Sequence, residues 1–88
     1  TLDEFLNTNL KLAIRCRTKE EAAKLIKAVN KYDKEWFYNS LEETMIDSWK
    51  YHGEDTCYSN DGGWGPISAF TDADYAIYQF EDIDLGDE

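Results

Sequence analysis

Few side chains in this sequence could carry acid–base or nucleophilic chemistry. His52 is the only histidine, and Ser48 precedes it by four residues, so the two could share one face of a helix. A serine and a histidine without an orienting carboxylate do not make a catalytic triad. Asp72 and Asp74 could act as an acid–base pair only inside a cleft, and the sequence does not indicate one. We therefore predict no catalytic residue and no enzymatic activity.

The spacing of possible ligands does not favour a metal or a cofactor either. An EF-hand loop with Gly62 as its sixth residue would place Cys57 at the first position, where an oxygen ligand is required. Cys16 and Cys57 match neither a zinc nor a CxxC redox spacing. We predict no metal and no cofactor, and interpret both cysteines as buried residues in a reducing cytoplasm. Because both fall on expected strands, a disulfide between them is the alternative.

The distribution of charge is more informative. The 88 residues carry a formal net charge of −10. Residues 1–50 contain as many bases as acids, whereas residues 51–88 contain ten acids and no lysine or arginine. This asymmetry indicates a protein partner with a basic surface and disfavours direct binding to nucleic acid. The alternative is that the charge only keeps a small domain soluble. Apolar runs are too short for a transmembrane helix, so no membrane partner is expected.

The acidic half also places an aromatic residue among turn residues. Trp64 has glycines on both sides and follows the turn at residues 60–63, so we expect it in a loop. Tryptophan is a frequent anchor at protein interfaces, although a ring folded back onto the sheet is the alternative. Carboxylates on a small rigid body can imitate a phosphate backbone and bind a basic groove. The candidate partner-binding residues are Glu54, Asp55, Asp61, Trp64, Asp72 and Asp74.

The elements that position these residues follow from periodicity. A short helix is expected over residues 2–7, and the alternation from residue 10 to 17 predicts a half-buried strand. The capping box Thr18-Lys19-Glu20-Glu21 opens an amphipathic helix over residues 19–31. The expected core positions are Leu10, Leu12, Ile14 and Cys16 on the strand, and Ala22, Leu25, Ile26 and Val29 on the helix.

The second part of the chain predicts shorter elements. An aromatic strand is expected over residues 35–38 and a weak helix over residues 41–50. Further strands are expected over residues 56–58, 67–70 and 75–80, the last one covered on both faces. The turn at residues 60–63 would join the first two of these strands in a hairpin.

Together these elements predict a single α+β domain over residues 1–88. Its sheet would be mostly antiparallel, with four to five strands, one long amphipathic helix packed on a face and one or two short helices. Residues 82–88 would form an acidic tail that frays.

Four segments, LDEFL, LAIRCRTKEEAAKLIKA, EDTCYSNDG and YAIYQFEDI, resemble small proteins of bacteriophages and prophages. Such proteins typically have a strand-helix-strand order with a threonine-capped helix and a late TCY strand. This chain departs from them at Tyr32-Asp33-Lys34, where a glycine often precedes the aromatic strand. Many small acidic phage proteins are anti-defence factors, including inhibitors of CRISPR nucleases, and some mimic DNA. The resemblance implies no particular site residues.

Charge and resemblance together predict a non-enzymatic phage inhibitor in the cytoplasm of a bacterial host. It would bind the basic nucleic-acid-binding groove of a defence nuclease, of the CRISPR Cas effector type, as an acidic DNA mimic. The alternative is a phage regulatory or assembly module without mimicry. That module would use the exposed helix face with Lys24, Lys27 and Lys31.

Overall fold

The computed structural model of the chain describes residues 2–32 and 42–83. In chain order the elements are α1 (Leu2–Leu6), β1 (Leu12–Arg15), α2 (Lys19–Tyr32), α3 (Glu42–Asp47), η1 (Ser48–Tyr51), η2 (Gly53–Asp55), β2 (Thr56–Ser59), β3 (Trp64–Pro66), α4 (Ile67–Asp72), β4 (Ala76–Gln79) and η3 (Phe80–Asp82). The strand expected over residues 35–38 lies outside the described residues. The acidic tail lies outside them from residue 84 onward, while Asp82 ends η3 and Ile83 packs on the core.

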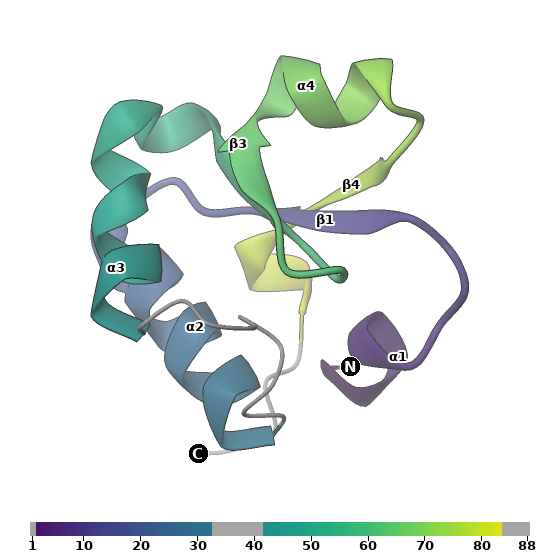
Figure 1. Cartoon of the computed structure of the whole chain (residues 1–88), viewed down its shortest axis with the longest axis horizontal. Coiled ribbons are helices and arrows are strands. Elements are labelled where there is room, and N and C mark those ends of the chain that lie inside the picture. The colour runs from purple at the N-terminus through teal and green to yellow at the C-terminus, as the bar shows by residue number, and fades with distance from the viewer. Residues whose placement is uncertain (1, 33–41, 84–88) are drawn as a thin grey trace.

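The four strands in the described part of the chain form one mixed sheet in the order β3-β2-β1-β4 (Figure 1). β1 and β2 are antiparallel, with Ile14 opposite Tyr58, and β2 and β3 form an antiparallel hairpin around the expected turn. β1 and β4, however, are parallel, with Ile14 opposite Tyr78. The prediction of a mostly antiparallel sheet is therefore wrong. Parallel neighbours require a crossover, and here the chain returns to the side of β1 only after passing through α2, α3 and the hairpin.

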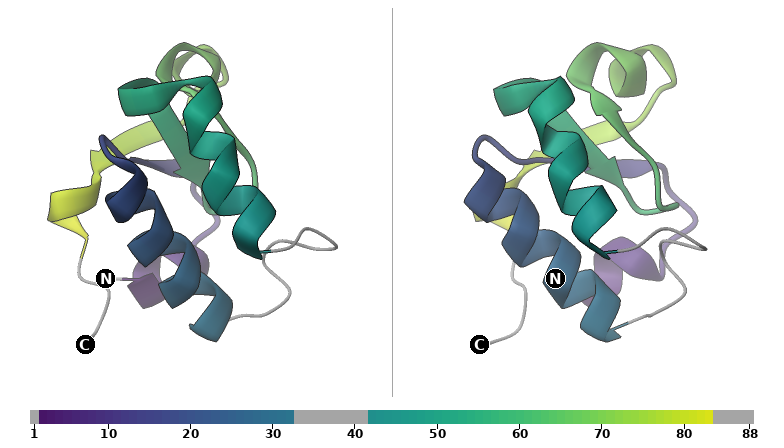
Figure 2. Two further views of the ribbon diagram at one scale, coloured as in Figure 1. Left: turned by 90° about the vertical axis from the view of Figure 1, so that its left-hand side faces the viewer. Right: turned by 60° about the vertical axis from the view of Figure 1, so that its left-hand side comes forward.

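Helices cover both faces of this sheet (Figures 1 and 2). The main core lies on the face covered by α2 and α3, and it takes Ile14 and Cys16 from β1 and the turn after it. On the other face, Phe70 of α4 packs with Ala13 and Cys57. The period-2 alternation predicted for β1 thus directs its side chains into two separate clusters. Leu10 is the exception, because it precedes the strand and its side chain is 67 % exposed.

α2 confirms the helix predicted over residues 19–31. Its four expected core residues, Ala22, Leu25, Ile26 and Val29, are fully buried. At 14 residues α2 has an ordinary length, so the expectation of a long helix is wrong. No helix among the described residues has the length and apolar character needed to cross a membrane.

Thr18 caps the N-terminus of α2 as the sequence predicts, whereas Glu21 reaches one residue further back than in a standard capping box. The Thr18 hydroxyl accepts a hydrogen bond from the Glu21 amide at 3.1 Å, and the Glu21 carboxylate accepts one from the Arg17 amide at 2.8 Å. We expect Thr18→Ala to lower the free energy of unfolding by about 1 kcal/mol, because one amide of the first turn loses its acceptor. Urea denaturation followed by circular dichroism measures this loss. Thr18→Ser keeps the hydroxyl and should cost much less; equal losses in the two variants would exclude capping as the cause.

Two expectations for the second half of the chain are wrong. The segment expected to be the return strand of the hairpin, residues 67–70, is the first part of α4, and the return strand is β3. Trp64 accordingly lies on an edge strand and not in a loop. The reason is that Ile67 and Phe70 are three residues apart, so one helical turn after Pro66 directs both onto the sheet.

The last strand also differs from its prediction. β4 was expected to be covered on both faces, but Ala76 and Tyr78 are exposed. β4 forms one edge of the sheet, and only the face that carries Ile77 packs against the cluster under α4. An apolar run on an edge strand therefore leaves one aromatic side chain at the surface.

Candidate functional site

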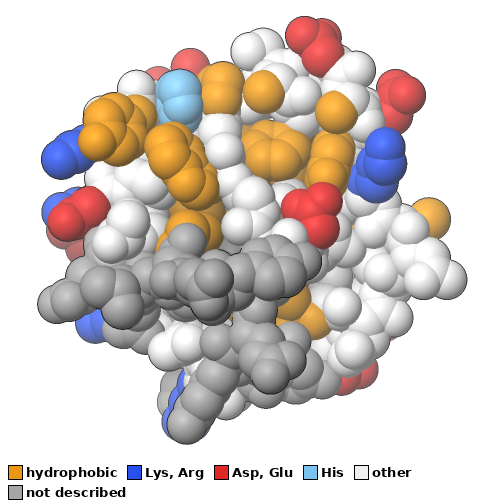
Figure 3. Space-filling view, in the orientation of Figure 1, with side chains coloured by type: hydrophobic (Ala, Val, Ile, Leu, Met, Phe, Trp, Pro, Cys, Tyr) orange, Lys and Arg blue, Asp and Glu red, His pale blue; other side chains and the backbone are white. Residues whose placement is uncertain are grey.

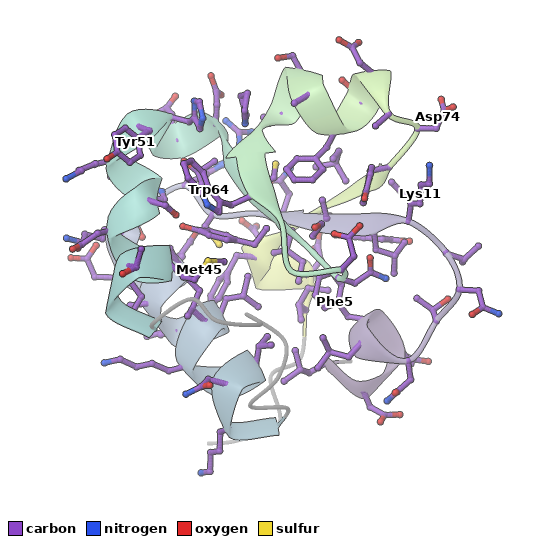
Figure 4. All side chains as sticks on the ribbon, viewed as in Figure 1. Phe5, Lys11, Met45, Tyr51, Trp64 and Asp74 are labelled. Carbon is purple, nitrogen blue, oxygen red and sulfur yellow. The ribbon has the colours of Figure 1, made fainter. Side chains whose placement is uncertain are left out.

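Three rings form an exposed cluster where η1 meets β3, and we name Tyr51, His52 and Trp64 the aromatic platform. The rings of Tyr51 and Trp64 are stacked, with centroids 5.7 Å apart and an interplanar angle of 20°. The His52 ring lies against the same indole at 5.8 Å, tilted by 49°. Tyr51 is 66 % and Trp64 39 % exposed, and Figure 4 shows the two side by side. Stacked rings at the surface offer a flat apolar contact area with polar edges.

The backbone holds this platform in place. In the hairpin, Trp64 pairs with the buried Tyr58, so both side chains project toward the face covered by α3 and η1. On η1, the Trp49 indole donates to the carbonyl oxygen of Cys16 at 2.9 Å. The Thr56 hydroxyl in turn donates to the carbonyl oxygen of Trp49 at 3.1 Å. These bonds tie η1 to β2 and to the residue that follows β1, so the segment that carries Tyr51 is anchored to the sheet.

Two of the candidate acids follow the platform directly in the chain. Gly53, with φ of 57°, allows the backbone to turn after His52, and Glu54 and Asp55 then lie exposed on η2. Arg15 binds this turn: its Nε donates to the carbonyl oxygen of Glu54 at 2.8 Å, and its guanidinium lies 3.6 Å from the Asp55 carboxylate. Arg15 thus partly neutralises the carboxylate of Asp55. Glu54 contributes only its backbone carbonyl oxygen to this contact, so its carboxylate takes no part in the bond.

Asp61 is held by hydrogen bonds inside the hairpin. One carboxylate oxygen accepts a bond from the Ser59 hydroxyl, and the other accepts one from the Tyr75 hydroxyl at 2.5 Å. Burial alone would raise the pKa of Asp61, but these bonds and two backbone amides stabilise the charged form and leave the pKa below its ordinary value. The bond to Asp61 also raises the pKa of Tyr75. Asp61 therefore links the β2–β3 turn to the start of β4.

This network predicts an acid-sensitive contribution to stability. Because the folded state lowers the pKa of Asp61, its contribution is complete above the unfolded pKa and is lost as the pH falls through the folded value. The difference in unfolding free energy between the wild type and Asp61→Asn should be largest above about pH 5 and shrink below about pH 4. Urea denaturation at a series of pH values measures it. A difference that does not change with pH would show that the charge of Asp61 plays no part.

The remaining candidate acids lie away from the platform. Asp72 ends α4, and Asp74 follows it with a positive φ of 66°. In Figure 4 Asp74 lies at the opposite side of the view from Tyr51 and Trp64. In the same orientation, Figure 3 shows acidic side chains as separate groups around the hydrophobic ones. The structure thus places Glu54 and Asp55 near the platform, and Asp72 and Asp74 at the far end of α4.

The chain matches no protein-family model, no curated protein and no solved structure. The resemblance to small phage proteins stays a prediction.

The residues considered for catalysis have other contacts. The Ser48 hydroxyl is buried and donates to the Met45 carbonyl oxygen at 2.5 Å, whereas His52 lies on Trp64. Cys16 and Cys57 are both free and buried, in clusters on opposite faces of the sheet, which rules out the alternative of a disulfide between them. Burial raises the pKa of Cys16 strongly and that of Cys57 to about 11, so both thiols stay protonated and are poor nucleophiles.

Metal ligands do not gather in the described part of the chain, where no group of three His, Cys, Asp or Glu side chains could hold an ion.

Sequence reasoning missed Tyr51, the most exposed ring of the platform. Tyr51 ends the weak helical segment and is followed by His52-Gly53, a pattern that marks the end of a helix. An aromatic residue at such an end cannot be assigned to the core by periodicity, so it could have been a candidate. Its contact with Trp64, 13 positions later, depends on the hairpin register and has no local signal.

Proposed function

We propose that this protein is a non-enzymatic binding protein that docks its aromatic platform onto a basic surface of another protein. The observation that supports it best is the stacked and exposed Tyr51–Trp64 pair, in which Tyr51 belongs to η1 and Trp64 to the β2–β3 hairpin. Rigid aromatic anchors lose little conformational entropy on binding and dominate the energetics of many interfaces.

The charge of the chain supports a basic partner. Downstream of Lys50 no lysine or arginine occurs, so this half of the chain creates a net negative field, and Glu54 and Asp55 are the acids of this half that follow the platform directly. Lys50 itself lies 5.4 Å above the Tyr51 ring, at the border of that field. Such a field accelerates association with a positive surface and makes it sensitive to salt.

The narrower proposal is that the partner is a nucleic-acid-binding protein, such as a bacterial defence nuclease, inhibited in the host cytoplasm. The acidic groups are separated on the face shown in Figure 3, so they do not form a row of carboxylates that copies a phosphate backbone. This arrangement favours a binding mode in which the aromatic rings anchor the partner and the charges steer its approach. The alternative, a regulatory or assembly module, would use Lys24, Lys27 and Lys31, which are exposed on α2.

Affinity capture from a bacterial lysate tests both forms of the proposal. The immobilised protein should retain a basic protein that is released by raised salt and, for the narrower form, by excess duplex DNA. A matched column carrying Lys24→Ala, Lys27→Ala and Lys31→Ala together should retain the same protein. If the wild-type column retains the captured protein and the lysine-variant column does not, the alternative module is correct and the platform is not the docking surface.

A further inference from the structure

A groove separate from the platform lies between α1 and the segment formed by β4 and η3. Its volume is about 590 Å³, within the range of pockets that take small ligands or a few peptide residues. Leu10, Leu12 and Tyr78 supply apolar lining, and two of them are unusually exposed for their size: Leu10 at 67 % and Tyr78 at 43 %. Apolar side chains that line a concave surface indicate a binding site more strongly than single exposed residues do.

An unpaired strand edge runs beside this groove. β4 is the last strand of the sheet, and among the residues that the structure describes no strand pairs with its outer edge. The Ala76 amide donates to the Lys11 carbonyl oxygen at 2.9 Å, so Ala76 and Tyr78 face β1 with their backbone groups. Because these directions alternate along a strand, the backbone amides and carbonyls of Ile77 and Gln79 face outward. Such an edge is a template for an added strand.

The charge of the groove restricts its occupant. Among the described residues that line it, every charged side chain is acidic: Asp3 and Glu4 on α1 and Asp82 on η3. Tyr78 lines the same groove, and the face of its ring can receive a cationic side chain. We propose that this groove binds an extended basic peptide segment of a protein partner, which adds as a strand to the free edge of β4. Its arginine or lysine side chains would face the acids, and its apolar side chains would contact Leu10 and Leu12.

This binding can be measured with a defined probe, an acetylated and amidated hexapeptide of alternating arginine and valine. Isothermal titration calorimetry with the full chain should detect binding, and the Ile77 and Gln79 amide signals should shift in NMR spectra. The same peptide N-methylated at every residue keeps its charge and side chains but cannot donate backbone bonds. It should bind at least about tenfold more weakly, since several hydrogen bonds are lost. A peptide with glutamate in place of arginine should not bind.

Variants of the protein locate the site. Leu10→Lys, at an exposed position, should weaken binding of the arginine–valine peptide by about fivefold or more through repulsion and lost apolar contact. Gln79→Pro removes one outward amide, and φ of −83° at Gln79 is close to the range of proline. Trp64→Ala should leave peptide binding unchanged, which separates this site from the platform. Equal affinity for the N-methylated peptide would overturn strand addition, and loss of binding in Trp64→Ala instead of Leu10→Lys would overturn the location.

Discussion

Replacing Tyr58 by alanine is expected to remove a large part of the protein's stability. Tyr58 is fully buried on β2, between β1 and β3, and its ring belongs to the main core under α2 and α3. Truncation of a buried aromatic residue costs about 3–5 kcal/mol through lost contacts and the cavity left behind. For 88 residues the total free energy of unfolding is on the order of 4–13 kcal/mol, so much of the variant should be unfolded.

A matched variant separates the ring from its hydroxyl. The Tyr58 hydroxyl donates to the Met45 carbonyl oxygen at 3.2 Å, but Ser48 donates to the same oxygen. Tyr58→Phe therefore leaves that acceptor bonded and should cost only about 1 kcal/mol. Thermal and urea denaturation, followed by circular dichroism, compare the two variants. If alanine costs no more than phenylalanine, the ring does not support the core as the structure indicates.

The parts of the fold that could be predicted are those with a strong local signal. α2 has a capping box and four apolar positions at helical spacing, and all four positions are buried because this face of the helix packs into the main core. β1 shows strict alternation, and the turn at residues 60–63 contains Gly62 with φ of 89°. In each case a few neighbouring residues determine the backbone, so the sequence carries the information locally.

The parts that could not be predicted depend on distant contacts. Residues 67–70 are too few for periodicity to distinguish a strand from one helical turn, and packing of Phe70 on Ala13 and Cys57 favours the helix. The parallel direction of β4 comes from its pairing with β1, more than 60 residues earlier in the chain, and no local pattern encodes it. The role of an acid likewise depends on distant contacts. Asp61 was predicted to be a docking group, yet both of its carboxylate oxygens accept hydrogen bonds, one of them from Tyr75, which lies 14 residues later in the chain.

Replacing both Tyr51 and Trp64 by alanine is expected to have the largest effect on partner binding. This prediction rests on the proposal that the platform is the docking surface. Interface anchors of this kind contribute about 2 kcal/mol or more, so capture of the basic partner should fall at least about 30-fold. The free energy of unfolding should change less than in Tyr58→Ala, because Tyr51 and Trp64 are both partly exposed whereas Tyr58 is fully buried. Retained binding, measured with partner purified from the wild-type column, quantifies the loss.

Tyr78→Ala provides the matched control for this double variant. Tyr78 is similar to Trp64 in exposure, but it lies at the opposite edge of the sheet, in the groove beside α1. Loss of this ring should leave capture by the platform unchanged while it weakens binding of the basic peptide. If Tyr78→Ala reduces capture as much as the double variant does, then the partner docks on the groove, and the charge of the acidic half acts there and not around Trp64.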